Sequence, residues 1–223
     1  MDTVEVSPFV FRNPVSAGTH LLWCLWAVFV TGLLWRLARG DRLRQLSVGC
    51  FGLSMVVLYA ASGTYHAIPA RFPALVQFFQ RVDHSAIYVL IAGTYTPVFA
   101  VLLRGPTRWW MLGLIWGIAA AGVACKWLLP WPPYGLTVGL YIGMGWVGVV
   151  TVYPLVQAVG VRGSALGLLG GLLYMAGGVC DAACWPVVLP YVVGPHEILH
   201  VLDMGATLIH VFFVMRYVLP FQG

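Results

Sequence analysis

Between Gln77 and Leu103 the chain reads QFFQRVDHSAIYVLIAGTYTPVFAVLL. After Asp83 this stretch contains no further Asp, Glu, Lys or Arg, and its length matches the roughly 20 mostly apolar residues that a helix needs to cross a bilayer. Polar and apolar residues do not alternate along it, as they do in the strands of a membrane barrel. The stretch therefore predicts a membrane-spanning helix that carries an acid, Asp83, and a histidine, His84, near its start.

The composition of the whole chain agrees with a membrane protein. Of the 223 residues, 61% are hydrophobic and only 9% are Asp, Glu, Lys or Arg, whereas about 25% are charged in an average soluble domain. So few charges cannot solvate the surface of a soluble domain of this length, which excludes a soluble enzyme and a disordered protein. The net charge of +5 is small, and the basic residues are spread over several loops, so a nucleic-acid-binding patch is excluded as well.

Ionisable residues and Pro/Gly turns divide the chain into seven segments of spanning length. We therefore predict an all-α integral membrane protein, a bundle of seven transmembrane helices in which residues 1–223 form a single domain. A connection is expected at the proline-rich residues 130–133, and the acids Asp2 and Glu5 argue against a cleaved signal peptide before the first helix. The predicted helices cover residues 16–36, 46–67, 77–103, 108–128, 134–157, 164–185 and 195–219.

Glycines repeat at intervals of four residues in and beside the fifth and sixth predicted helices. Small residues at this spacing let membrane helices approach one another closely, so both rows are expected to be helix-packing faces. The two rows are Gly135, Gly139 and Gly143, and Gly163, Gly167 and Gly171.

Ionisable side chains inside a bilayer are unfavourable unless they are paired or bind a ligand. Two pairs of polar residues stand out because the members of each lie one helical turn apart on one face. Ser62 and His66 form the first pair, and His196 and His200 form the second, at the start of the last helix. Two histidines at i and i+4 match the spacing of zinc ligands on helices. Asp203, further along the same face, is positioned to orient an imidazole.

The expected topology brings these groups together. The second helix ends, and the third begins, on the same side of the membrane, so His66 lies at the depth of Asp83. The seventh helix also begins there, which adds His196 and His200, with Ser62 one turn deeper. A lone histidine in a membrane helix is compatible with a hydrogen-bonded core residue. Three histidines and an acid at one depth instead indicate a metal site, and three histidines with an open fourth position are the pattern of catalytic zinc.

Three motifs make the chain resemble the haemolysin III branch of the progestin-and-adipoQ-receptor family, which belongs to a superfamily that includes the alkaline ceramidases. The resemblance covers nearly the whole chain and implies seven transmembrane helices. The motifs are Ser62-x-x-x-His66, the run DHSAIYVLIAGTYTP from Asp83 to Pro97, and His196-Glu-Ile-Leu-His200.

The resemblance also implies a zinc site between the second, third and seventh helices. Its ligands would be His66, His196 and His200. Ser62 and Asp83 match positions beside the metal and its water, so we expect both to be catalytic, with Asp83 accepting a proton from that water. Some members of the superfamily hydrolyse the amide bond of ceramides.

One residue departs from the family pattern. The run from Gly177 to Pro186 contains Asp181, where a more aromatic and less acidic run is expected. Three roles are open for Asp181: pairing with a nearby cation, lining a polar cavity, or facing water near the helix end, and the last two together are favoured. Four further residues are expected to pack or to support the site without binding metal, namely His20, His84, His210 and, at a helix N-terminus, Glu197.

A Zn²⁺ site of this kind favours an intramembrane hydrolase that cleaves a lipid amide or ester. Its partners would be membrane lipids, with a fatty-acyl or ceramide-like substrate, and no nucleic acid. Two alternatives stay open, a zinc-containing receptor or sensor without turnover and a pore-forming haemolysin, although the helices lack an amphipathic, channel-lining stripe. The oligomeric state does not follow from the sequence.

The basic residues predict an orientation in a bacterial plasma membrane. Eight of the 12 Lys and Arg residues lie opposite the N-terminus, and cytoplasmic loops carry the excess of such residues. The N-terminus and zinc layer are therefore expected outside and the C-terminus in the cytoplasm, whereas receptor members of the family are taken to have a cytoplasmic N-terminus. The eight residues are Arg36, Arg39, Arg42, Arg44, Arg104, Arg108, Arg162 and Arg216.

Overall fold

The computed structural model describes residues 11–129, 134–190 and 192–222, and within them the chain forms seven α-helices and no β-sheet. The prediction of an all-α protein with seven helices is confirmed. A short π-helical turn, η1 (Val214–Val218), continues the last helix. The helices are α1 (Pro14–Leu37), α2 (Arg42–Ala67), α3 (Pro73–Leu102), α4 (Gly105–Leu128), α5 (Tyr134–Val150), α6 (Val152–Ala182) and α7 (Pro195–Phe213).

Six of these helices are long and apolar enough to cross a membrane, the last of them counted together with η1. The remaining helix, α5, is apolar but has only 17 residues. Such a set of helices is that of an integral membrane protein.

The largest difference from the predicted boundaries lies between the fifth and sixth helices. The sequence predicts helices over 134–157 and 164–185, whereas α5 ends at Val150 and α6 begins at Val152. Inside α6, Gly160 has φ +71° and ψ 174°, so this element consists of two helical pieces, residues 152–159 and 161–182. Glycine adopts such a positive φ without a Cβ clash. The break therefore falls within the gap between the two predicted helices, while the predicted connection at 130–133 lies outside the described residues.

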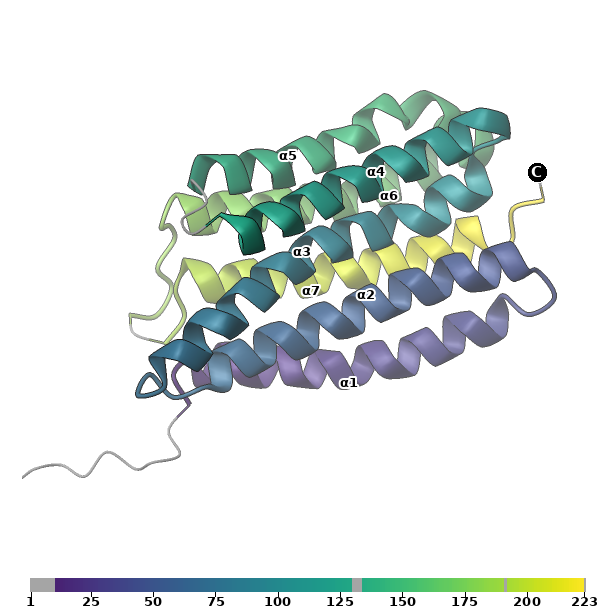
Figure 1. Ribbon diagram of the computed structural model, residues 1–223. Coiled ribbons are helices and arrows are strands. Elements are labelled where there is room, and N and C mark those ends of the chain that lie inside the picture. The colour runs from purple at the N-terminus through teal and green to yellow at the C-terminus, as the bar shows by residue number, and fades with distance from the viewer. Residues whose placement is uncertain (1–10, 130–133, 191, 223) are drawn as a thin grey trace, which may run out of the picture.

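The helices run side by side in one bundle (Figure 1). α1 packs along α2, α2 along α3, α3 along α4, and α6 along α7. Figure 1 shows that α2 ends, and α3 and α7 begin, at the end of the bundle where α1 begins, while α7 ends at the opposite end. This is the topology on which the predicted polar layer depends.

The bundle has an apolar outer surface and an interior that contains polar groups. On α1, Leu22, Leu25 and Phe29 expose 69%, 69% and 71% of their surface and lie in one row along the helix. Tyr59 and Tyr88 are fully buried in the interior. In a bilayer the exposed apolar side chains contact lipid tails, whereas buried polar groups must find their partners inside the bundle.

The two glycine rows differ in what surrounds them. A Cβ on Gly163 would lie 2.9 Å from the ring of Tyr217, so this position does allow close packing, as predicted. For the row in α5 the prediction is wrong, because among the described residues no side chain of another helix lies within 4 Å of a Cβ at any of its glycines. Four-residue spacing places glycines on one face but does not say whether another helix covers that face. The open row is Gly135, Gly139 and Gly143.

Gly122 of α4 offers a test of the packing between α3 and α4. A Cβ there would lie 2.5 Å from Cε1 of Tyr88, which is fully buried. We expect Gly122→Ala to lower the free energy of unfolding by about 1–3 kcal/mol, the usual cost of overpacking. A Cβ at Gly117 on the same helix would have no neighbour within 4 Å. Gly117→Ala therefore changes stability only through the higher helix propensity of alanine, and it is the matched control. Unfolding of both variants in detergent micelles measures the difference, and equal stabilities would contradict the close approach.

Candidate metal centre

His66 lies in the last turn of α2, and the N-terminal segment holds this turn in place. The backbone N–H of Asn13 donates to the carbonyl oxygen of His66 at 3.1 Å, and Nη2 of Arg12 donates to the carbonyl oxygen of Tyr65 at 3.1 Å. The Arg12 guanidinium also lies 4.1 Å from the centre of the Tyr65 ring. The last carbonyl groups of a helix lack partners within the helix, so these contacts stabilise the turn that presents His66.

The first turns of α7 carry His196 and His200. Pro195 occupies the first helical position, where its missing N–H leaves no bond unmade. The carboxylate of Glu197 accepts a hydrogen bond from the backbone N–H of Gly194 at 2.9 Å and another from Oγ of Ser16 at 2.8 Å. Glu197 therefore caps α7 and links it to α1, which confirms its predicted supporting role.

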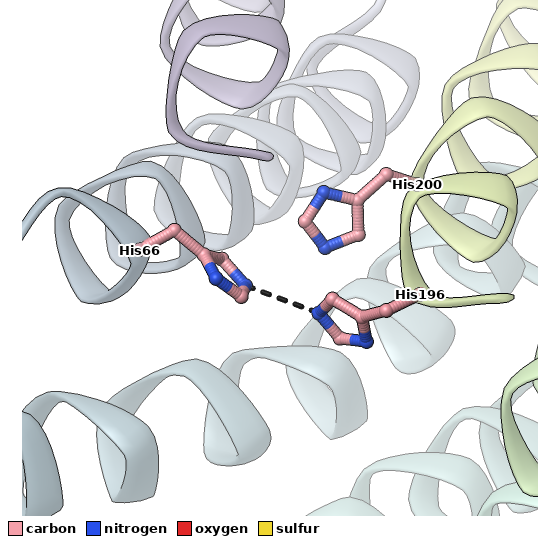
Figure 2. Close-up of side chains that lie close together, drawn as sticks. All are labelled: His66, His196 and His200. Carbon is pink, nitrogen blue, oxygen red and sulfur yellow. Dashed lines mark hydrogen bonds between the residues drawn. The ribbon is translucent and has the colours of Figure 1, made fainter. Parts of the chain in front are cut away.

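Three histidines meet at this end of the bundle (Figure 2). His66, His196 and His200 each offer a ring nitrogen, and these three nitrogens lie within 4.8 Å of one another. Figure 2 shows His66 approaching from one helix and the other two from the helix that faces it. The Nε2 atoms of His66 and His196 are 3.2 Å apart. Two nitrogens bound at about 2.0–2.1 Å to a tetrahedral zinc ion are about 3.3–3.4 Å apart, so this separation matches one edge of such a site.

Asp181 controls which nitrogen of His196 is free. Its Oδ1 lies 3.0 Å from Nδ1 of His196, so the carboxylate accepts a hydrogen bond from Nδ1–H. In this tautomer Nε2 carries no hydrogen, and its lone pair is directed toward His66. Histidines that bind metals usually donate their second N–H in this way, which fixes the tautomer. Asp181 lies near the end of α6 with its side chain 38% exposed, so it does face water, as favoured from the sequence, and it also pairs with an imidazole because the end of α6 meets the start of α7.

Several polar atoms of the cluster have no partner in the described part of the chain. Nδ1 of His66 and Nδ1 of His200 are both buried without a hydrogen bond, so within the described residues only His196 of the three imidazoles has a carboxylate partner for its second nitrogen. Three imidazoles with a carboxylate behind one of them form a donor set that suits Zn²⁺. The residues present therefore fit the zinc ion that the resemblance implies.

His20 and Tyr59 support the third imidazole. The rings of His20 and His200 stack with centroids 3.6 Å apart and planes 15° from parallel, and Tyr59 meets the His20 ring edge-on at 5.1 Å. His20 is buried, and neither of its ring nitrogens has a hydrogen-bond partner among the described residues. His20 thus packs against the cluster without joining it, as predicted.

The other two histidines have different surroundings. Nδ1 of His210 lies 2.8 Å from the carbonyl oxygen of Ala206, one turn earlier on α7, and the His210 ring stacks on Tyr174. His84 is half-buried, and its carbonyl oxygen accepts a hydrogen bond from the hydroxyl of Tyr141 at 2.8 Å. Neither belongs to the group of candidate ligands, in agreement with their predicted packing roles.

Ser62 and Asp83 are brought to the cluster, but Asp203 is not. Ser62 and Asp83 are 2% and 6% exposed, and Asp83 lies close enough to Ser62 and His196 for both to act on its carboxyl group. Asp203 lies deeper, beside Tyr59, and its Oδ2 has no partner in the described residues. The predicted orienting role of Asp203 is therefore wrong, and Asp181 takes that role instead.

The cluster is buried on one side and open on the other. His66 and His200 are buried, whereas the side chains of His196 and Asp181 are 40% and 38% exposed. Water and ions can therefore reach the cluster from the end of the bundle, while Ser62 and Asp83 border it from the interior.

Known proteins resemble this chain over the same region. The family model described as haemolysin-III related matches residues 10–211. Hemolysin-3 of Bacillus cereus is 38% identical over 218 residues, which is 97% of this chain and 96% of that protein. The Hemolysin-3 homolog of Bacillus subtilis (strain 168) is 36% identical over 132 residues, which is 59% of this chain and 61% of that protein. The region that the family model matches includes all three histidines and Asp181.

Metal content after purification in zinc-replete detergent buffer tests the cluster. We expect about one zinc ion per wild-type chain and loss of the ion from His200→Ala, because only two imidazoles remain. Asp181→Ala keeps all three ligands and should weaken zinc binding about 10- to 100-fold. His210→Ala removes an imidazole outside the cluster and serves as the matched control, which should keep its zinc. Wild type without zinc under these conditions would rule out the site.

Proposed function

The chain belongs to the haemolysin-III-related family, and we propose that it is a zinc-dependent hydrolase that cleaves a lipid amide or ester in the membrane. The observation that carries this proposal is the 3.2 Å separation of the His66 and His196 Nε2 atoms beside the buried Ser62 and Asp83. Three imidazole ligands leave a fourth position open, and an open position distinguishes catalytic from structural zinc. A buried hydroxyl and carboxylate at this position provide the groups that hydrolysis needs.

Each residue has a distinct role in this proposal. His66, His196 and His200 hold the ion, which when bound makes water more acidic and polarises a carbonyl oxygen. Asp83 accepts a proton from the attacking water and donates it to the leaving nitrogen or oxygen as the C–N or C–O bond breaks. The Ser62 hydroxyl donates a hydrogen bond to the carbonyl oxygen, where negative charge develops. The products are a carboxylic acid and an amine or alcohol.

The surroundings of the cluster favour a substrate with acyl chains. Ser62 and Asp83 lie in the interior of the bundle, and the outer faces of the helices are apolar. A lipid that enters from the bilayer keeps its chains in an apolar environment while its amide or ester reaches the two residues. Ceramide-like lipids and phospholipids have this form.

Release of fatty acid from ceramide and from phosphatidylcholine in mixed micelles tests the activity. We expect Asp83→Asn to keep its zinc but to lower turnover about 10²- to 10⁴-fold, the usual contribution of a general acid–base group. Asp203→Asn replaces another buried acid, which lies beside Tyr59 and is not a candidate ligand, and this matched control should retain turnover. Full turnover in Asp83→Asn would exclude Asp83 as the proton acceptor.

The same variants separate hydrolysis from the two alternatives. Zinc-loaded wild type that cleaves neither lipid would favour a receptor or sensor. The relatives are named hemolysins, so leakage of a dye from liposomes is worth measuring in parallel. A pore should tolerate Asp83→Asn, whereas lysis that follows from lipid hydrolysis should be lost with it.

The basic residues support a plasma-membrane orientation with the histidine cluster outside and the C-terminus in the cytoplasm. Four basic residues lie at the cluster end, and the other eight of the 12 lie opposite, where a cytoplasmic excess is expected. A reporter enzyme that is active only in the cytoplasm should be active when fused after Gly223. Activity restricted to an outside-active reporter at the same position would reverse the assignment. The four residues at the cluster end are Arg12, Arg71, Arg81 and Lys126.

A further inference from the structure

A pocket of about 430 Å³ lies at the end of the bundle opposite the histidine cluster. We propose that it binds the phosphate-bearing headgroup of an anionic phospholipid from the surrounding membrane. This inference is independent of the proposed hydrolase. The pocket is lined by Asp41, Leu43 and Arg44 at the start of α2, Ala100 and Val101 near the end of α3, Arg104 and Arg108 around the start of α4, and Phe221 after the last helix.

Arg44 lines this pocket, and its side chain is held in place by several contacts. Its Nε lies 3.1 Å from Oδ2 of Asp41, and its two Nη atoms donate to the carbonyl oxygens of Leu219 and Phe221. The charge of Arg44 is therefore balanced by Asp41, and its contacts hold the C-terminal segment against the pocket.

Arg104 and Arg108 supply positive charge that the described part of the chain leaves unbalanced. Nε of Arg108 donates to the carbonyl oxygen of Leu103 at 2.9 Å, which holds the guanidinium in place without using its terminal N–H groups. Within the described residues, neither arginine has a carboxylate within ion-pair distance. Guanidinium groups bind phosphate oxygens through paired hydrogen bonds, so two free guanidinium groups at one pocket suit a phosphate.

The start of α4 adds a second attraction for an anion. Arg104 is the N-cap residue, no side chain caps the helix, and its first turn contains no acidic residue. The first N–H groups of a helix have no partner within it and, together with the helix dipole, favour a negative charge. Of the residues in this first turn only Arg108 lines the pocket, so the start of α4 contributes through its dipole.

An adjoining apolar groove distinguishes a phospholipid from a free phosphate ion. The groove has a volume of about 680 Å³ and is lined by Gly105, Pro106, Trp109, Trp110 and Gly113. Among the described residues nothing lies within 4 Å of a Cβ built at Gly105 or Gly113, so the space is open. Gly105, Trp109 and Gly113 form one row along α4, and Arg104 and Arg108, each one position earlier, form the row about 100° around the helix.

The position of the groove fits the boundary of a bilayer. Trp109 and Trp110 are 61% and 78% exposed, and exposed tryptophans gather at the membrane–water interface. An acyl chain can lie in the groove while the headgroup occupies the arginine pocket. Basic pockets between helices on the cytoplasmic side are known to hold anionic headgroups, and the excess of basic residues lies at this end of the bundle.

Binding of phosphatidylglycerol with a fluorescent acyl chain tests the proposal on the full-length protein in nonionic micelles. Unlabelled phosphatidylglycerol should compete at least about tenfold better than phosphatidylcholine, and binding should weaken as salt screens the charges. Arg104→Gln combined with Arg108→Gln should weaken binding about 25-fold, since each basic residue near an anionic surface contributes about fivefold. Arg162→Gln changes an exposed arginine that lines neither pocket nor groove, and this control should bind as wild type does.

Three results would overturn the proposal. Equal competition by phosphatidylcholine would remove the preference for an anionic headgroup. Competition by inorganic phosphate as strong as that of phosphatidylglycerol would assign the pocket to a soluble anion. Unchanged binding in the double variant, or a loss of equal size in Arg162→Gln, would place the lipid elsewhere. If the double variant does not fold, the lipid competition and the salt dependence measured on the wild-type protein still test whether the pocket prefers an anionic phospholipid.

Discussion

A polar group inside a membrane must find its partner within the protein, because the surrounding lipid offers none. At the cluster end of this bundle the chain meets that requirement with contacts between helices that are far apart in sequence. Glu197 caps α7 and accepts a hydrogen bond from α1, Asn13 caps the end of α2, and Asp181 accepts the N–H of His196. The imidazoles of His66, His196 and His200 face one another between these contacts, and under the proposed function a cation is the partner that all three share.

The two ends of the bundle have opposite electrostatic character. The cluster end joins imidazoles with acids, a combination that suits a cation. The opposite end joins unpaired arginines with an uncapped helix start, so it attracts anions. Because α2 and α3 extend from one end to the other, both of these helices contribute residues to each of the two proposed sites.

The sequence predicted much of this structure because spacing on a helix and helix order are local information. His66, His196 and His200 could be grouped because the second helix ends where the seventh begins. Asp181 could not be placed, since its partner lies across the loop from α6 to α7, and no spacing rule spans that loop. Asp203 was assigned to the imidazoles because it shares their helix face, yet in the bundle that turn of the helix is already beside Tyr59.

The same limit explains the other differences. The stacking of His20 on His200 depends on how far α1 is shifted along α7, which a single sequence does not report. The glycine row of α5 has the spacing of a packing face but points away from the other described helices. Gly160, in contrast, falls in the gap between two helices that the hydrophobic pattern predicts. The break in the helix and the end of the hydrophobic pattern occur at the same place in the sequence.

The contact between His66 and His196 joins residues 130 positions apart, and that between Ser16 and Glu197 joins residues 181 positions apart. A chain is made from its N-terminus, and its helices enter the membrane as they are synthesised. Ser62, His66 and Asp83 therefore enter the bilayer before the last helix, which carries His196 and His200, has been translated. The three histidines come together only when the last helix has inserted, so under the proposed function a truncated or stalled chain can neither bind zinc nor act on the lipids around it.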